Sequence, residues 1–213
     1  MKTKLTLTTL CILGLFIGSA TAQVKSKSAV QSVNLFAIQS TDTSDLLMNE
    51  RRFWGIIMEA KEGTKNNYKA QIENLKRLLF TLEPQEIEQF DNRFAAMMDV
   101  ANDSRLWAAA SVINGGCSEE CFEFFRQYLI AQGGDKFYAT LNNPETCSTW
   151  IKSETQEDWG GLLYVAPKIY RMKTTKQIPD SYNPESVMKG EPMDEMSALK
   201  LYPKLAKKFI TRN

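Results

Sequence analysis

The chain has 213 residues, 43% of them hydrophobic, and its 26 basic and 25 acidic residues give a formal net charge of +1. This balance does not supply the basic surface that nucleic-acid binding requires. Histidine is absent, which excludes Ser-His-Asp and Cys-His nucleophilic sites, HExxH metalloprotease sites and histidine-rich metal sites.

The first 22 residues have the pattern of a secretory signal peptide. Lys2 and Lys4 precede an apolar run from Leu5 to Gly18, and Ala20-Thr21-Ala22 forms an A-x-A cleavage site. The run is shorter than the roughly 20 apolar residues that span a bilayer, so it does not predict a membrane anchor. We therefore expect cleavage after Ala22 and a secreted or periplasmic protein with no integral membrane segment.

The exported chain divides into a linker and one domain. Residues 23–44 are rich in Ser, Thr, Gln and Lys and predict a flexible linker, whereas the apolar spacing is helical from residue 45 onward. The region 45–213 is long enough for a single domain that buries roughly 70% of its surface. Asn49 is suited to cap a first helix, a second helix is expected to begin near Asn67, and Pro84 suits the first turn of a third.

The most informative stretch, residues 106–133, predicts two helices joined by a Gly-Gly corner. Asn114 and Gly115 are expected to end the first helix, because glycine adopts the left-handed conformation without strain. Ser118 is a natural N-cap for the second. The helical spacing of Phe122, Phe125 and Leu129 places these side chains on one face, so this second helix is predicted to form the centre of the core.

After this hairpin, Asp135 is expected to cap a short helix that ends before Pro144. The apolar segment 162–170 is interrupted by Pro167, and residues 174–193, which contain three prolines, predict a long loop. Long loops are uncommon in compact domains and are often functional. One last amphipathic helix follows. The sequence therefore predicts an all-α fold, a single compact multi-helix domain with a central helix-Gly-Gly-helix hairpin and a long Pro-containing loop before the last helix.

Several of these residues carry a family resemblance over about residues 52–209. They are Arg52-Phe53-Trp54, Leu106-Trp107-x-Ala109-Ala110, Asn114-Gly115-Gly116, Ser118, Phe122, Phe125-Arg126, Leu129-Ile130, Gln132-Gly133, Tyr164-x-Ala166, Tyr170, Tyr202-Pro203-x-Leu205 and Phe209. With these residues the chain resembles a bacterial family of uncharacterised proteins labelled only as a domain of unknown function. The resemblance implies a mainly helical single domain and no particular activity, cofactor or catalytic residue. The signal peptide and Cys121 differ from the more usual cytosolic members.

Trp107, Asn114 and Arg126 are the candidate binding residues. Arg126 lies on a largely apolar helix, where a buried guanidinium needs a partner. One interpretation is a structural ion pair with Glu123 or a distant acid. The other is an anchor for an anion or peptide carboxylate beside Trp107 and Asn114.

Export leaves three cysteines, Cys117, Cys121 and Cys147, in an oxidising compartment where disulfides persist. We expect a bridge between Cys121 and Cys147, which would tie the central helix to the loop after Pro144. Cys117 precedes a helix N-terminus, which lowers a thiol pKa, but Glu119 and Glu120 oppose this effect. The cysteine spacing is poor for zinc, so no metal site is expected.

These observations favour an exported, non-catalytic domain that binds an unknown protein or small molecule, without a cofactor. The carboxylate pairs Glu119/Glu120 and Glu157/Asp158 leave open a carboxylate-dependent hydrolase acting on cell-envelope material. A redox-active thiol protein that uses Cys117 is the third hypothesis.

Overall fold

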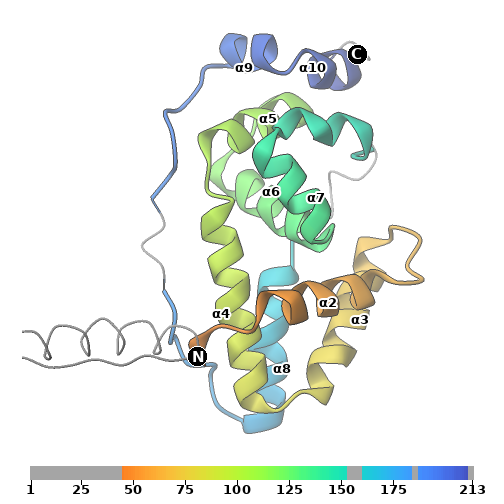
Figure 1. Ribbon diagram of the computed structural model, residues 1–213, viewed down its shortest axis with the longest axis vertical. Coiled ribbons are helices and arrows are strands. Elements are labelled where there is room, and N and C mark those ends of the chain that lie inside the picture. Colours follow the sequence, from red (N-terminus) through yellow and green to blue (C-terminus); the bar gives the residue numbers. More distant parts are fainter. Residues whose placement is uncertain (1–44, 153–159, 184–186, 211–213) are drawn as a thin grey trace, which may run out of the picture. The chain divides into compact units, whose positions relative to one another are not determined.

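The computed structural model describes residues 45–152, 160–183 and 187–210, and these residues form helices and loops without strands (Figure 1). The predicted signal peptide (1–22), the predicted linker (23–44) and the pair Glu157/Asp158 lie outside the described residues. The described residues belong to one compact unit. The all-α prediction is therefore confirmed for this part of the chain.

The first helices begin at the residues predicted to start them. Helix α2 (Glu50–Lys61) is capped by Asn49, whose side chain accepts a hydrogen bond from the Arg52 amide. Helix α3 (Tyr68–Thr81) is capped in the same way by Asn67. Helix α4 (Pro84–Val100) has its proline at the first position, where the missing N–H costs nothing.

The central hairpin consists of α5 (Ser104–Asn114) and α6 (Glu119–Ala131). Helix α5 ends at Gly115, which has a left-handed backbone with φ of 67°. The Ser118 side chain accepts a hydrogen bond from the Cys121 amide at 3.2 Å and caps α6. Both ends of the corner are thus fixed by short-range interactions that can be read from the sequence.

Helix α6 lies in the centre of the core, as predicted. Phe122, Phe125 and Leu129 are at most 2% exposed, and α6 contacts α2, α4, α5 and α7. Phe124 is only partly buried and packs on Gly160, where an added Cβ would lie 2.9 Å from the Phe124 ring. The core therefore forms around one helix that is covered on several sides.

Among the described residues four shorter elements follow: α7 (Gly134–Asn142), the 3-10 helices η1 (Pro144–Thr149) and η3 (Leu162–Tyr164), and α8 (Val165–Thr174). Asp135 lies in the first turn of α7, and Gly133, not Asp135, occupies the N-cap position. Pro167 is the third residue of α8. A proline is tolerated there because amides of the first turn have no intrahelical partner.

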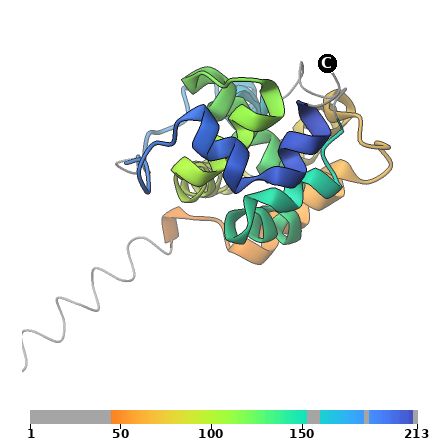
Figure 2. The ribbon, with the colours of Figure 1, turned by 90° about the horizontal axis from the view of Figure 1, so that it is seen from above.

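The last predicted helix is two short helices, α9 (Glu195–Leu201) and α10 (Pro203–Phe209). The expectation of one continuous helix was wrong because Pro203 cannot donate a backbone hydrogen bond and instead begins a new helix. Both helices pack against α5 (Figures 1 and 2). The Tyr202 hydroxyl, between them, donates to the Arg105 carbonyl at 3.0 Å.

Candidate functional site

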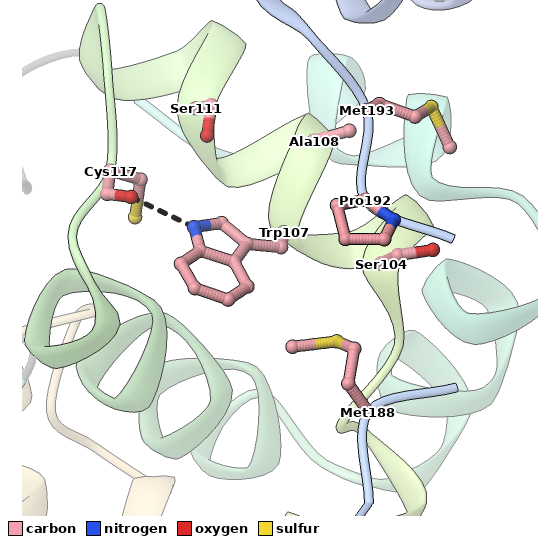
Figure 3. A pocket seen from close by; sticks show the side chains of 8 residues that line it. All are labelled: Ser104, Trp107, Ala108, Ser111, Cys117, Met188, Pro192 and Met193. Atoms are coloured by element: carbon pink, nitrogen blue, oxygen red, sulfur yellow. Dashed lines mark hydrogen bonds between the residues drawn. The ribbon is translucent and has the colours of Figure 1, made fainter. Parts of the chain in front are cut away.

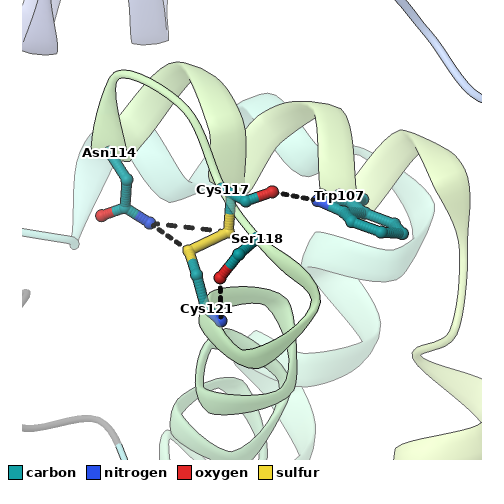
Figure 4. The surroundings of a disulfide bond; sticks show 5 residues. All are labelled: Trp107, Asn114, Cys117, Ser118 and Cys121. Atoms are coloured by element: carbon teal, nitrogen blue, oxygen red, sulfur yellow. Dashed lines mark hydrogen bonds between the residues drawn. A yellow bond between two sulfur atoms is a disulfide. The ribbon is translucent and has the colours of Figure 1, made fainter.

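The cysteines next to the corner form a disulfide that differs from the predicted one. Cys117 is bonded to Cys121, with their Cα atoms 5.3 Å apart, and Cys147 is a buried free thiol. The predicted Cys121–Cys147 bridge is therefore wrong. Cys117 immediately precedes Ser118, the N-cap of α6, and Cys121 lies in the first turn of that helix. This turn brings the two side chains together (Figure 4).

Cys147 lies in η1 and packs against α7. Its sulfur lies 3.9 Å from the Thr140 hydroxyl oxygen, and burial raises the pKa of the thiol to about 12. A thiol with such a raised pKa is not a nucleophile near neutral pH. Cys147 therefore has a packing role.

Two of the three predicted binding residues contact the disulfide corner (Figure 4). The indole N–H of Trp107 donates to the Cys117 carbonyl at 2.8 Å. The Asn114 amide lies 3.2 Å from the Cys121 sulfur and 4.0 Å from the Cys117 sulfur. Both side chains thus brace the turn between α5 and α6.

Arg126, the third predicted binding residue, is partly buried in α6. Its guanidinium donates to the Met98 carbonyl at 3.1 Å and lies 4.8 Å from the centre of the Phe122 ring. Its Nε is buried and has no hydrogen-bond partner among the described residues, and burial lowers the pKa of the side chain. Trp107 stacks on the same ring at 5.1 Å, so Phe122 connects the two predicted binding residues.

Trp107 and Cys117 line a cavity of about 270 Å³ (Figure 3). One wall is α5, with Ser104, Ala108 and Ser111, and the opposite wall is Met188, Pro192 and Met193. Apolar side chains with a few hydroxyl groups are the usual lining of a small-molecule site. We call this space the Trp107 cavity.

The second wall belongs to residues 187–194, which we call the arm. The arm is attached to the turn between α4 and α5: the Ser104 amide donates to the Lys189 carbonyl at 2.8 Å, and the Lys189 amide donates to the Asn102 carbonyl at 2.9 Å. The Lys189 ammonium also donates to the Asp99 carbonyl at 2.8 Å. These bonds hold Met188 opposite Trp107.

A smaller cavity of about 150 Å³ continues along α5. It shares Ala108, Ser111 and Met193 with the Trp107 cavity and reaches Leu199 and Ile210. The Trp107 cavity thus lies where residues 188–193 face α5, and the smaller cavity lies where α9 covers the same helix. The sequence predicts the proline-containing loop but does not indicate that this loop faces Trp107.

The carboxylates considered for acid–base chemistry do not line the Trp107 cavity. Glu119 and Glu120 are exposed at the start of α6. A different group, Asp91 with Glu88 and Asp180, comes together at α4, and the pKa of Asp91 is raised to about 7 by burial and by these two neighbours. None of these three acids lines either cavity along α5.

The described part of the chain holds no group of three or more Cys, Asp or Glu side chains arranged to bind a metal ion. It also holds no helix with the length and apolar character needed to cross a bilayer.

Comparison with known proteins gives a family and no activity. No curated protein and no solved structure matches the chain. The model of the family described as "Protein of unknown function (DUF4240)" matches residues 48–172. The match includes α5, α6 and the disulfide, whereas the arm, α9 and α10 lie beyond it. Since the match covers more than half of the chain and agrees with the resemblance seen in the sequence, the protein belongs to the DUF4240 family.

Proposed function

We propose that this protein is an exported, non-catalytic binding domain and that the Trp107 cavity receives an apolar group of its ligand. The observation that carries this proposal is the cavity itself: about 270 Å³ between an indole ring and two methionines, with two serines at its wall. Methionine side chains adapt their shape to different apolar ligands. The ligand would therefore be recognised mainly by shape and apolar contact.

Export is supported by the N-terminal sequence and by the cysteines. Residues 1–22 have the charged start, apolar run and A-x-A site of a signal peptide. The Cys117–Cys121 disulfide is a bond that persists in oxidising compartments. Expression of the full chain in bacteria, followed by fractionation and N-terminal sequencing, tests this part. We expect protein in the periplasm or medium that begins at Gln23, and uncleaved protein in the cytosol would contradict it.

Binding is tested with the neutral apolar fluorophore N-phenyl-1-naphthylamine. We expect saturable fluorescence enhancement at one site and energy transfer from Trp107. Ser111→Phe would fill the cavity from α5 and abolish the enhancement. Gln85→Phe, which adds the same ring at an exposed position of α4, is the control and should bind the fluorophore as the unmodified chain does. Equal binding by the Ser111→Phe variant would refute the assignment of the site.

Thiol–disulfide exchange is a second candidate function, favoured by the position of the Cys117–Cys121 bond. The bond lies at the start of a helix and beside the Trp107 cavity, and the Asn114 amide can donate to the Cys121 sulfur. Equilibration with glutathione buffers followed by alkylation measures it. A redox-active pair would be half reduced near about −200 mV, where glutathione couples operate. A bond that stays oxidised far below this potential is structural.

A further inference from the structure

A separate cavity lies on another face of the domain, between α2 and the turn that joins α6 to α7. Its volume is about 560 Å³, which falls within the range of small-molecule sites. All its lining residues lie between Arg51 and Tyr138, inside the family match. Trp54, Gln132 and Gly133, on which the family resemblance rests, are among them. We call it the Trp54 cavity.

Glycines shape this cavity. Gly133 has φ of 94° and ψ of 164°, a conformation that is essentially restricted to glycine. A Cβ there would lie 2.2 Å from the Met58 sulfur, and a Cβ on Gly134 would lie 3.2 Å from the Trp54 ring. The backbone conformation of Gly133 therefore favours glycine, and the absence of a side chain at Gly134 leaves the α7 backbone in close contact with the Trp54 ring.

One wall of the cavity is aromatic and held in place. The Trp54 and Tyr138 rings lie 6.0 Å apart in an edge-to-face arrangement. Both donate to the same oxygen of Glu50, the indole N–H at 3.2 Å and the hydroxyl at 2.5 Å. Since both polar ends are engaged by Glu50, this wall offers ring surfaces for apolar contact.

The rest of the lining carries more positive than negative charge. Lys61, Lys136 and Arg51 line the cavity together with one acidic residue, Asp135. The Lys61 ammonium donates to the Gln132 side-chain oxygen at 2.6 Å, and the Lys136 ammonium lies 5.0 Å from the Trp150 ring centre. Among the ion pairs between described residues, none includes these three cations.

The electrostatics of Lys61 agree with a site in which positive charge exceeds negative charge. Its pKa is lowered to about 8 by burial and by the positive charge of Lys136. An anion placed between the two ammonium groups would relieve this repulsion and favour the charged form of Lys61. No side chain caps the start of α7, and the partial positive charge of that helix end adds to the same field, offset in part by Asp135 in its first turn.

From this geometry we propose that the Trp54 cavity binds a small organic anion, in which a carboxylate or phosphate group contacts Lys61 and Lys136 and a flat apolar part lies against Trp54 and Tyr138. Helix α2 supplies Trp54 and Lys61 to the cavity lining, and α7 supplies Lys136 and Tyr138. The two halves of the ligand would therefore be recognised at the same time.

Calorimetric titration of the full chain with benzoate, phenyl phosphate and the neutral benzyl alcohol tests the proposal. We expect at least one of the two anions to bind and benzyl alcohol to bind at least tenfold more weakly. In nuclear magnetic resonance spectra the bound anion should shift the Trp54 indole N–H and the Gly134 amide and leave the Trp107 indole N–H unchanged. A preference for benzoate or for phenyl phosphate identifies the acidic group.

Charge variants make the test specific. Lys61→Gln and Lys136→Gln should each weaken anion binding by roughly tenfold or more, the loss expected for a charge-assisted hydrogen bond. Lys61→Arg keeps the charge and should retain binding, which separates a folding defect from loss of the site. Lys200→Gln removes a positive charge from exposed α9 and should have no effect.

Three outcomes would overturn the proposal. Equal affinity for benzyl alcohol and the anions would show that the cavity binds by apolar contact alone and does not recognise the negative charge. Unchanged binding in both glutamine variants would place the anion elsewhere, and absence of binding by both anions would show that the site does not take this class of ligand. The Trp107 cavity is tested with a neutral fluorophore, so failure of either site leaves the other unaffected.

Discussion

Replacing Asp91 by asparagine should stabilise the protein at neutral and alkaline pH and remove part of its pH dependence. Asp91 lies in α4 near Asp180 and Glu88, and burial followed by these two acids raises its pKa from 3.8 to about 7. Between pH 4 and pH 7 the folded state therefore keeps a proton that the unfolded state has released. Stability must fall as the pH rises through this window, because the folded state binds more protons.

The magnitude follows from the shift. One pKa unit corresponds to about 1.4 kcal/mol, so a shift of roughly three units predicts a loss of up to about 4 kcal/mol between pH 4 and pH 8. An asparagine is neutral in both states and does not contribute this loss. With a urea m-value of about 2 kcal/mol per M, the midpoint at pH 8 would rise by up to about 2 M.

Urea denaturation of the Asp91→Asn variant and the unmodified protein, at pH 5 and at pH 8, measures the effect. The variant should already be more stable by about 1.6 kcal/mol at pH 5, where the unfolded-state carboxyl is mostly ionised, and the gap between the two midpoints should widen at pH 8. Glu59→Gln, which removes an exposed carboxylate of α2, is the control and should follow the unmodified protein at both pH values. If the urea midpoint of the Asp91→Asn variant changes between pH 5 and pH 8 as much as that of the unmodified protein, the reasoning is refuted.

Two further predictions concern the central hairpin. Phe125→Ala removes a fully buried ring from α6 and should lower the free energy of unfolding by about 3–5 kcal/mol. Phe80→Ala, at a side chain that is 51% exposed, should lower it far less. Equal thermal midpoints for the two variants would contradict the placement of the core. Gly115→Ala places a side chain at φ of 67° and should cost about 1–2 kcal/mol in urea denaturation. Gly55→Ala, in the middle of α2 with open space around its Cβ position, should instead be neutral or stabilising by about 0.5–1 kcal/mol.

The sequence by itself determined most of the helical elements and the position of the core helix. Asn49 and Ser118 cap the helices they were predicted to cap, the helix expected near Asn67 begins there, and Gly115 ends α5. These signals are readable because a cap satisfies amides only two or three residues away, so its partner is always close in the sequence. The spacing of apolar side chains in α6 identified its buried face for the same reason.

The tertiary structure alone decided which distant segments meet. Nothing in the local pattern of residues 187–194 indicates that Met188 lies opposite Trp107, because that contact depends on hydrogen bonds between the Lys189 backbone and the turn before α5. Arg126 likewise found a carbonyl of α4, Met98, instead of a nearby acid.

The Trp107 cavity and the Trp54 cavity also depend on contacts between residues far apart in the sequence. Trp54 and Gly133 are 79 positions apart and meet only because α2 packs against the end of α6. Caps and helical periodicity involve neighbours along the chain, whereas a cavity is formed by side chains of several packed elements. Its shape and charge depend on how those elements pack, which the spacing of residues within any one of them does not specify.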